Sequence, residues 1–592
     1  MTDPTLEPGS LRSGYASGRC TPAQVVETVL ARIAARGDDG VWICMVEPDH
    51  LRNAAAALDP ADRERLPLWG VPFAVKDNID VAGMPTTAAC PGFAYEPTTT
   101  APVVERLLEA GALLVGKTNL DQFATGLNGT RSPYGVPVSV ADPDLISGGS
   151  SSGSAVVVAA GLVSFAIGTD TAGSGRVPAA LNGVVGLKPT HGLVSTRGIV
   201  PACRSLDCPS VFTTSVADAS AVLAVLASYD ELDPYARPLG KPSPPLRMPL
   251  DRLRIGIPDQ ICAWGARGER ACWDELLSRL TGAGAELVAV PMEPFFEAGD
   301  QLYGGAWLAE RLHGLATFLG ERSNEVLPEI REVLLGAGGV SGVEAFGAFD
   351  RMQALRRTVS RLLATVDVLI TPTVTETFAV AEMVADPVAL NARLGRFTTF
   401  TNLLDLCALA VPAGRGAGGH PFGVTVQAAA GKDATISAVG AAIEALLGDA
   451  PTPAAAWAEP PAATLDLAVV GAHLAGFPLH EQLVERGAQL VARTATAPRY
   501  RLYRLLDAHP PKPALSRTGS SGSEIAVEVY RLPLAEVGGF LAHVAAPLAI
   551  GQVELADGSF VHGFVCEPWG LDGAEDITAH GGWAAYCGST AR

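Results

Sequence analysis

The sequence lacks the features that mark membrane and secreted proteins. Its longest apolar stretch, near residues 155–166, contains Gly161 and Ser164 and is too short to cross a bilayer. Its first residues, MTDPTLEPGSLRSG, have neither the basic nor the apolar region of a secretory signal peptide. Its ten cysteines are scattered, with no Cys-x-x-Cys or Cys/His ligand spacing. We therefore expect no membrane partner, no metal site and a cytoplasmic protein with reduced thiols.

Basic residues are also scarce. Lysine and arginine number 43 against 62 aspartates and glutamates, which gives a formal net charge of −19. An acidic protein repels phosphate backbones, so nucleic acid is not an expected partner. The chain has 592 residues, of which 48% are hydrophobic and 18% charged. These values are typical of a folded protein with two or more domains.

Helix and strand signals alternate along the larger, N-terminal part. TPAQVVETVLARIAAR, residues 21–36, begins with the cap, first-turn proline and capping-box partner of a helix. LWGVPFAVKDNIDV, residues 68–81, is typical of a buried strand. Residues 104–123 predict a helix, a stop at Gly111 and another strand. The alternation predicts an α/β fold.

The composition changes at residues 448–465. The segment GDAPTPAAAWAEPPAAT is rich in proline and alanine and has no helical periodicity, which is typical of a linker. Residues 466–592 contain β-rich runs, two of which flank a hairpin turn signal at Asp557–Gly558. The sequence therefore predicts a larger domain over residues 1–447 and a smaller, β-rich domain after the linker.

Residues 145–181 are rich in glycine and serine and contain no histidine or cysteine. A flexible linker would not run directly into AVVVAAGLVSFAIG, which predicts a buried helix followed by a strand. A phosphate loop needs GxxxxGK[ST], and no lysine stands at that spacing. The pattern favours a glycine-rich backbone whose N–H groups face a developing oxyanion, with serine hydroxyls close enough to relay protons.

Four motifs, PFAVKDNI, GKTNLDQFATG, GGSSSGSA and GTDTAGSGRVPA, resemble the amidase signature family. The match covers most of residues 21–445 and implies an α/β domain with a mixed β-sheet core flanked by helices. It also implies a nucleophile at Ser174, a bridging serine at Ser150 after a cis peptide bond, and a base at Lys76. No cofactor is implied.

These residue types also fit amide hydrolysis on chemical grounds. A serine hydroxyl is a weak nucleophile until a neighbour removes its proton. Lysine can be that neighbour only when it is neutral, which requires burial that lowers its pKa, and Lys76 lies inside an apolar strand. The hydroxyl of Ser150 can bridge Lys76 and Ser174, because it both donates and accepts hydrogen bonds.

The residues around Ser174 have expected roles as well. Asp170 and Arg176 flank it and are interpreted as a buried structural ion pair. Backbone groups near Gly126 are expected to contact the substrate. The oxyanion hole would consist of four backbone N–H groups, those of Thr171, Ala172, Gly173 and Ser174.

Departures from the general family pattern narrow the range of possible substrates. The sequence has Ser152 and Ala172 where glycine is common and Gly175 where a β-branched residue is common. These departures, and the motifs VVGAHLAGFPLHEQL, PPKPALSR and GFVCEP after residue 465, resemble the allophanate hydrolases, whose C-terminal domain is a barrel related to γ-glutamylcyclotransferases. The resemblance implies hydrolysis of allophanate to ammonia and CO₂ through an acyl-enzyme on Ser174 and N-carboxycarbamate. It further implies a homodimer and coupling to a biotin-dependent urea carboxylase.

A pair of residues that binds the substrate carboxylate is expected further along the chain. Tyr303 and Arg311 are separated by about two helical turns, which places them on roughly the same side of one helix. In allophanate hydrolases a Tyr and an Arg at this spacing bind the carboxylate, and the planar guanidinium suits it. The alternative is a surface arginine paired with Glu310 or another neighbour.

In the smaller domain, His473 follows an apolar strand and is the main candidate for proton transfer or carboxylate contact. Weaker candidates are His480, Glu528, His562 and Glu567. The domain either completes the breakdown of N-carboxycarbamate or only supports dimerisation. In the second case His473 is an ordinary core residue.

Other functions stay open on the sequence alone. The chain could be a small-acid amidase of malonamate type, the glutaminase subunit of a tRNA-dependent amidotransferase, or a catalytically silent scaffold. A glutaminase would leave residues 466–592 unexplained, and intact Lys76, Ser150 and Ser174 argue against a scaffold. Whether urea or s-triazine breakdown supplies the substrate is also open.

Overall fold

The chain divides into two compact units, Met1–Trp457 and Ala458–Arg592. Residues 449–463, which make up most of the expected linker, lie outside the described residues. The structure, a computed structural model, describes residues 5–240, 248–251, 253–448, 464–505, 510–519 and 521–590.

One mixed sheet of eleven strands forms the centre of the first unit, in the order β1-β3-β2-β4-β6-β5-β10-β11-β9-β7-β8. Neighbours are parallel in β3-β2-β4 and in β9-β7-β8, and antiparallel elsewhere. The expected mixed sheet is therefore confirmed. Its strands are β1 (Trp42–Met45), β2 (Pro72–Lys76), β3 (Leu113–Thr118), β4 (Phe165–Asp170), β5 (Val185–Lys188), β6 (Cys208–Thr213), β7 (Arg254–Pro258), β8 (Glu286–Val290), β9 (Val368–Pro372), β10 (Leu406–Arg415) and β11 (Pro421–Ala429).

Both faces of the sheet are buried at the central strands β2 and β4. On β2, Phe73 and Val75 pack into one apolar cluster while Ala74 between them packs into another, because side chains alternate across a strand. On β4, Phe165 belongs to the first cluster and Ala166 to the second. Burial on both sides explains why these strands are continuously apolar instead of alternating with polar residues.

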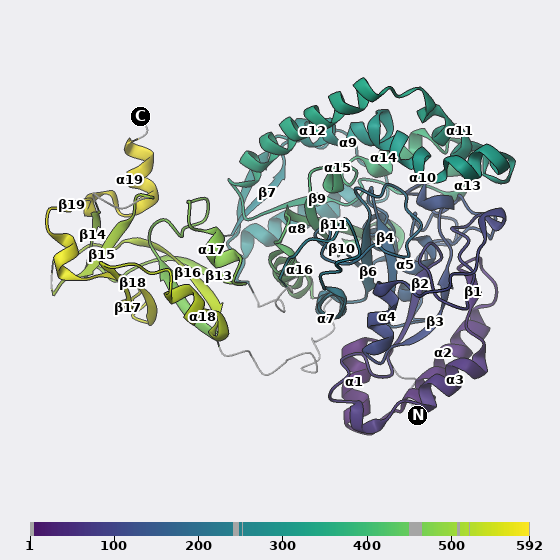
Figure 1. Ribbon diagram of the computed structural model, residues 1–592, viewed down its shortest axis with the longest axis horizontal. Coiled ribbons are helices and arrows are strands. Elements are labelled where there is room, and N and C mark those ends of the chain that lie inside the picture. Colours follow the sequence, from purple (N-terminus) through teal and green to yellow (C-terminus); the bar gives the residue numbers. More distant parts are fainter. Residues whose placement is uncertain are drawn as a thin grey trace. The chain divides into compact units, whose positions relative to one another are not determined.

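Helices pack on the two faces and at the edges of the sheet (Figure 1). The helices α9 to α12 contact one another in one layer, and α2 contacts α3 near β3. The helices of the first unit are α1 (Pro8–Ala16), α2 (Pro22–Arg36), α3 (Pro48–Ala56), α4 (Pro102–Glu109), α5 (Ser152–Ala159), α6 (Val177–Asn182), α7 (Val216–Leu226), α8 (Glu269–Gly282), α9 (Glu293–Gly304), α10 (Ala306–Arg322), α11 (Pro328–Gly336), α12 (Gly342–Leu363), α13 (Val380–Ala385), α14 (Ala389–Gly395), α15 (Phe400–Leu403) and α16 (Asp433–Leu447).

The local sequence signals are confirmed. Thr21 caps α2, and the capping box with Gln24 is complete. The backbone at Gly111 has φ +87°, a left-handed conformation that ends the α4 turn before β3 begins. The serine-rich stretch forms the buried helix α5 followed by β4, as expected.

The second unit is β-rich and has two sheets, β13-β16-β12-β18-β17 and β15-β14-β19. The ends of the five-stranded sheet are joined by the bridge Thr496–Leu555, just beyond β13 and β17, which closes that sheet at one end in a barrel-like manner. The predicted hairpin turn at Asp557–Gly558 connects β17 to β18. The elements are β12 (Thr464–Val469), α17 (Glu481–Val484), β13 (Gln489–Ala495), β14 (Tyr500–Arg504), β15 (Pro513–Arg517), β16 (Ala526–Pro533), α18 (Leu534–Leu541), β17 (Leu548–Glu554), β18 (Phe560–Cys566), β19 (Glu575–Asp576) and α19 (Trp583–Thr590).

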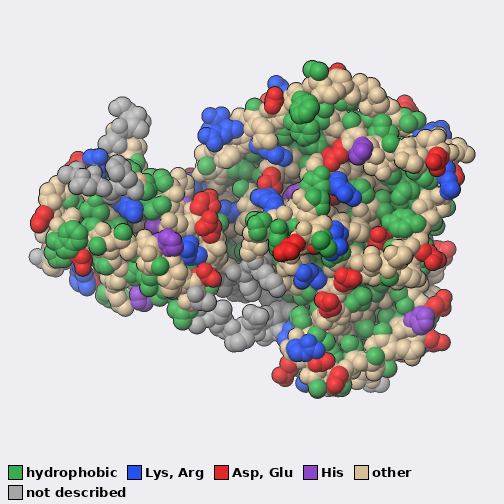
Figure 2. Space-filling view, viewed as in Figure 1, with side chains coloured by type: hydrophobic (Ala, Val, Ile, Leu, Met, Phe, Trp, Pro, Cys, Tyr) green, Lys and Arg blue, Asp and Glu red, His purple; other side chains and the backbone are tan. Residues whose placement is uncertain are grey.

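Two structural observations concern the expectations about nucleic acid and membranes as partners. Figure 2 shows acidic and basic side chains interspersed over the visible face of the first unit, and its described residues form no broad basic patch there. None of the described helices has the length and apolar character needed to cross a bilayer.

Candidate active site

Lys76 is the last residue of β2, a strand whose residues are all buried. Its side chain is inaccessible to solvent, and its Nζ donates hydrogen bonds to Ser150 Oγ and Thr169 Oγ1, each over 2.8 Å. Because burial disfavours the ammonium form, the pKa of Lys76 is lowered to about 7. A substantial fraction of this amine is therefore neutral near pH 7 and able to accept a proton.

Ser150 lies between Lys76 and Ser174. It follows a cis peptide bond from Gly149, and its Oγ donates to Ser174 Oγ over 2.9 Å. Together with the contact to Lys76, this gives a continuous hydrogen-bonded chain from an amine through one hydroxyl to another. All three side chains are buried. Since hydroxyls both donate and accept, the chain can carry a proton from Ser174 toward Lys76.

Asp121, a residue that sequence reasoning missed, shapes the backbone around Ser150. Its N–H donates to the carbonyl of Ser150 over 3.0 Å, and its carboxylate accepts from the N–H of Gly129 over 3.1 Å. The N–H of Gly149 donates to the carbonyl of Leu127 over 2.8 Å. A Cβ at Gly149 would collide with the Asp121 carboxylate, so glycine is required there. The signal that could have identified Asp121 is its position as an acidic residue inside the motif GKTNLDQFATG.

Asp170 and Arg176 form the expected buried ion pair, with Arg176 Nε 2.9 Å from Asp170 Oδ2 and both side chains inaccessible to solvent. The same carboxylate accepts from the N–H groups of Gly173 and Gly175, over 2.9 and 3.0 Å. The pair therefore folds the segment that carries Ser174. Burial by itself would raise the pKa of Asp170, but the Arg176 guanidinium holds it below its usual value.

The hydrogen bond from Gly173 corrects one expectation. Its N–H is directed at the Asp170 carboxylate and is not free for an oxyanion, so including Gly173 among the four donors was wrong. The N–H groups of Thr171, Ala172 and Ser174 make no hydrogen bond to any described residue. Gly173 has φ +127° and a Cβ there would collide with Thr398, so the turn before Ser174 requires glycine at this position.

Tyr303 and Arg311 do not belong to one helix, which corrects a second expectation. Tyr303 is near the end of α9, and Arg311 is in α10, which begins at Ala306. Gly305 separates them with φ −173° and ψ −131°, values outside the helical region. The two side chains nevertheless meet, with the Arg311 Cζ 5.7 Å from the centroid of the Tyr303 ring.

Arg311 is buried, with 2% of its surface exposed, so it is not the surface arginine of the alternative interpretation. Glu310, the partner proposed in that interpretation, instead accepts hydrogen bonds from Ser205. Arg311 donates from one terminal nitrogen to Thr125 Oγ1 over 3.1 Å. Its Nε has no hydrogen-bond partner among the described residues, so this buried donor is available to an anion.

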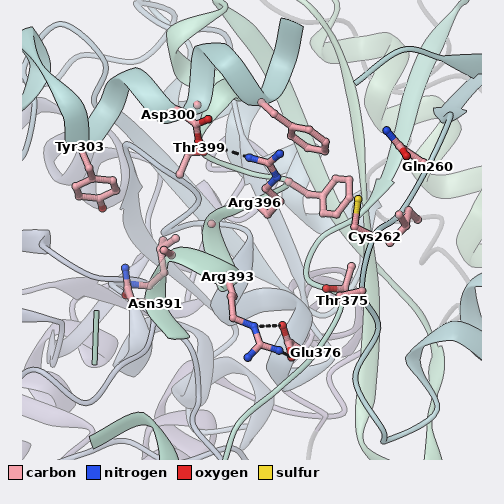
Figure 3. A pocket seen from close by; sticks show the side chains of 18 residues that line it. Gln260, Cys262, Asp300, Tyr303, Thr375, Glu376, Asn391, Arg393, Arg396 and Thr399 are labelled. Atoms are coloured by element: carbon pink, nitrogen blue, oxygen red, sulfur yellow. Dashed lines mark hydrogen bonds and ion pairs between the residues drawn. The ribbon is translucent and has the colours of Figure 1, made fainter. Parts of the chain in front are cut away.

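Tyr303 also lines a cavity of about 460 Å³. Figure 3 shows Asn391, Arg393 and Arg396 of the α14 region around the same cavity, with Arg393 paired to Glu376. The residues that line this space do not include Lys76, Ser150 or Ser174.

Asn391 links that cavity to the buried serines. Its Oδ1 accepts from the N–H of Leu127 over 2.7 Å, and Leu127 in turn holds Gly149 through its carbonyl. Gly126 lies between Leu127 and Thr125, the residue that accepts from Arg311. The structure thus places Gly126 beside the arginine, and a contact between Gly126 and substrate stays a prediction.

In the second unit, His473 is half-buried in an aromatic setting. Its ring stacks on Phe564, with centroids 5.0 Å apart, and its Nε2 lies 3.1 Å from Gln482 Oε1. Burial lowers the pKa of His473. The Nδ1 of His480 lies 3.2 Å from the carbonyl oxygen of His473.

Glu528 lies in the same region and accepts from the N–H of Ala475 over 2.8 Å. It also accepts from Arg493 Nε over 3.0 Å and Tyr530 Oη over 2.9 Å, two residues that sequence reasoning did not identify. Arg493 becomes a neighbour of Glu528 only through the pairing of β13 with β16, whereas Tyr530 lies two residues further along β16 itself.

His562 and Glu567 are exposed, and no described contact joins either of them to His473. Glu567 accepts from Trp569 Nε1 over 2.6 Å. The structure therefore brings together His473, His480 and Glu528, and leaves the other two candidates outside this group.

Comparison with known proteins agrees with this arrangement. Residues 24–436 match the amidase family, and residues 465–588 match the allophanate hydrolase C-terminal domain. The chain is 41% identical over 580 residues to the urea amidolyase of Saccharomyces cerevisiae, which covers 93% of this chain and 31% of the relative. It is 35% identical over 423 residues to a glutamyl-tRNA(Gln) amidotransferase subunit of Acidobacterium capsulatum, covering 66% of this chain and 88% of that one.

Two solved structures extend the likeness to nearly the whole chain. The Kluyveromyces lactis allophanate hydrolase has a TM-score of 0.73 and 38% identity, covering 98% of this chain and 99% of that one. The K. lactis urea amidolyase has the same TM-score and identity but is covered over 37% of its length. The chain thus spans about a third of the urea amidolyases that it matches. From the family match over its first unit and the domain match over its second, the chain belongs to the amidase family and carries an allophanate hydrolase C-terminal domain.

Proposed function

We propose that this protein is an allophanate hydrolase, which converts allophanate (urea-1-carboxylate) to ammonia and CO₂. The observation that carries the proposal is the buried chain from Lys76 through Ser150 to Ser174, with 2.8 and 2.9 Å between successive atoms. The K. lactis allophanate hydrolase, alike over both units, supports the choice of substrate.

The proposed reaction begins with a proton transfer. Neutral Lys76 takes the proton of Ser150 while Ser150 takes that of Ser174, which reverses the hydrogen-bond directions at unchanged distances. The Ser174 oxygen attacks the terminal amide carbon of allophanate, and the N–H groups of Thr171, Ala172 and Ser174 stabilise the oxyanion.

Collapse of this intermediate breaks the C–N bond. The relay returns its proton to the leaving nitrogen, which departs as ammonia, and an acyl-enzyme remains on Ser174. Water, deprotonated through Ser150 and Lys76, hydrolyses the ester and restores the serine. The product, N-carboxycarbamate, loses CO₂ to give carbamate, which yields the second ammonia and second CO₂. No step requires a cofactor.

Substrate orientation is assigned to Tyr303 and Arg311. Allophanate is a small planar anion, and the unpartnered Nε of buried Arg311 provides a charged donor for its carboxylate. The Tyr303 ring packs against the guanidinium and keeps it in place. Gly126, next to Thr125, is proposed to contact the substrate through its backbone.

The second unit is proposed to accelerate the breakdown of N-carboxycarbamate. His473 would supply or accept the proton, and His480 and Glu528 would orient it. This assignment is supported by the place of the three residues in one region, where His480 contacts the carbonyl of His473 and Glu528 accepts from the N–H of Ala475. A purely structural, dimer-supporting role is the alternative.

The proposal extends to partners and location. The match to urea amidolyases supports coupling to a biotin-dependent urea carboxylase, which would supply allophanate from urea. All ten cysteines are free thiols, which fits a reducing compartment and supports the cytoplasm. We propose a homodimer, with residues 1–447 as the hydrolase domain.

Ammonia release by wild type and Ser174→Ala, on allophanate, malonamate and glutamine, tests the substrate. We expect allophanate to give by far the highest kcat/KM, and Ser174→Ala to abolish turnover. Preferred hydrolysis of malonamate or glutamine would overturn the assignment. Glutamine is included because of the 35% identity to a subunit of a tRNA-dependent amidotransferase.

A further inference from the structure

Asp207, just before β6, is a buried carboxylate that the reaction described above does not use. It is 4% exposed. One oxygen accepts from the Thr171 hydroxyl over 2.5 Å, and the other accepts from the N–H of Ala202 over 2.9 Å. The N–H of Cys203 lies 3.1 and 3.2 Å from the two oxygens. These contacts tie the first residue of the oxyanion segment to a separate, well-anchored turn.

A second contact strengthens the same connection. Asn402 Nδ2 donates to the carbonyl of Asp170 over 2.8 Å and to the carbonyl of Leu206 over 3.0 Å. These carbonyls belong to the residues that precede Thr171 and Asp207. The segment that contains Thr171 and the segment that contains Asp207 are therefore connected twice: by the Thr171–Asp207 hydrogen bond and through the Asn402 side chain.

The charge of buried Asp207 also acts on the buried cations of the site. Its charge favours the ammonium form of Lys76, as do Asp121 and Asp170, while Arg311 opposes that form. Burial raises the pKa of Asp207 to about 6, against the lowering effect of the Thr171 hydrogen bond and of Arg311. At pH 7 the carboxylate is therefore mainly ionised.

We propose that Asp207 is a positioning residue for amide hydrolysis: it fixes the oxyanion segment through Thr171 and supplies negative charge to the environment of Lys76 and Arg311. The inference rests on the proposed function of the Lys76–Ser150–Ser174 chain, but not on the identity of the substrate. Two consequences follow, one for transition-state stabilisation and one for the pH dependence.

The first consequence is tested with Thr171→Val, which removes the hydroxyl at nearly constant volume. Misplacing one oxyanion donor should lower kcat about 10- to 100-fold, with KM changed by less than about threefold. Thr171→Ser keeps a hydroxyl and should restore kcat to within about threefold of wild type. The matched control is Thr190→Val, because Thr190 donates to buried Asp433 over the same 2.5 Å on an element outside the site. Equal kcat for Thr171→Val and Thr190→Val would overturn the positioning role.

The second consequence is tested with Asp207→Asn. Removing the negative charge disfavours protonated Lys76, so the acid limb of the kcat profile should move to lower pH, by about half a unit or more. Asp433→Asn is the control and should leave the limb in place. An unmoved limb in folded Asp207→Asn would contradict the electrostatic role, and Thr171→Val still tests the positioning role if Asp207→Asn does not fold.

A substrate-independent measurement separates this proposal from the choice of allophanate. The rate at which a fluorophosphonate modifies Ser174, followed by intact mass, reports the nucleophile and the oxyanion donors together. A Ser174–phosphorus bond forms, fluoride leaves, and the proton passes to Lys76. Thr171→Val should slow this reaction about 10- to 100-fold whichever amide is hydrolysed. If allophanate is not a substrate but Thr171→Val is labelled more slowly than wild type, the substrate assignment fails and the role of Asp207 stands. Equal labelling rates for Thr171→Val and wild type overturn the role of Asp207.

Discussion

The guanidinium of Arg311 lies 5.7 Å from the centroid of the Tyr303 ring, although the two residues come from different helices. The chain turns at Gly305, and α9 and α10 then pack together so that both side chains reach the same place. One face of the pair is held by Thr125, and the Tyr303 side opens on the cavity in Figure 3. Tyr303 therefore stands between the buried cation of Arg311, which does not itself line the cavity, and a space large enough for a small anion.

Replacing Arg311 should therefore affect binding more than chemistry. Arg311→Ala is expected to raise KM for allophanate about 10- to 100-fold, the equivalent of one charge-assisted hydrogen bond, with kcat reduced far less. Arg322→Ala, an exposed position at the end of the same helix, serves as control and should leave KM unchanged. Steady-state kinetics on ammonia release measures both. A loss confined to kcat would contradict carboxylate binding by Arg311.

The pKa of Lys76 sets the pH dependence of the first step. If neutral Lys76 is the base, as proposed, its pKa of about 7 means that kcat should fall about tenfold per pH unit well below pH 7 and level off above it. Lys76→Met should lower kcat by more than about 10³-fold at every pH. A profile in wild type that stays flat down to pH 5 would exclude Lys76 as the base.

The same shift has a consequence for folding stability. The pKa of Lys76 is lower in the folded chain than its ordinary value of 10.5, so the unfolded chain binds a proton that the folded chain releases. Between about pH 7 and 10 the contribution of Lys76 to the free energy of unfolding should therefore rise with pH. Lys76→Met lacks that slope, which urea denaturation at several pH values can show.

The sequence predicted the parts of the site that lie inside continuous motifs. Lys76, Ser150 and Ser174 each stand in such a motif, and the Asp170–Arg176 pair is separated by only a few residues. Contacts made through distant segments were not predictable in this way. Asp207 meets Thr171 only because β4 pairs with β6, and a single sequence carries no record of that register.

The two corrected expectations have local physical causes. Tyr303 and Arg311 are eight residues apart, which would place them on one side of a continuous helix. The helix is interrupted between them, because the glycines at 304–305 have a low helix propensity and allow the chain to bend. For Gly173, the motif indicates that N–H groups are gathered, but not which of them the Asp170 carboxylate takes. Only the folded geometry shows that the N–H of Gly173 is directed at the Asp170 carboxylate and not at the position of an oxyanion.

The Asp170–Arg176 pair should matter for stability as much as for activity. Arg176→Met leaves a fully buried carboxylate without its counter-ion, and we expect a loss of about 3–5 kcal/mol in the free energy of unfolding. Because Arg176 depresses the pKa of Asp170, the stabilisation is present above the unfolded value and should be lost as pH falls below about 4. Glu275→Gln, which removes an exposed pair with Arg279, is the control and should cost less than about 1 kcal/mol. Similar losses for the two variants would show that the buried pair has no special role.

The role of the second unit can be separated from amide hydrolysis by the order in which ammonia appears. In the proposed reaction, hydrolysis at Ser174 releases one ammonia, and the second requires breakdown of N-carboxycarbamate. If His473 assists that breakdown, His473→Ala should release the first ammonia at the wild-type rate and the second after a lag, detected by stopped-flow ammonia and CO₂ assays. His562→Ala, an exposed histidine on β18, should behave as wild type. If His473→Ala released both equivalents together at the wild-type rate, the histidine would be a packing residue against Phe564 and the second unit would act only structurally.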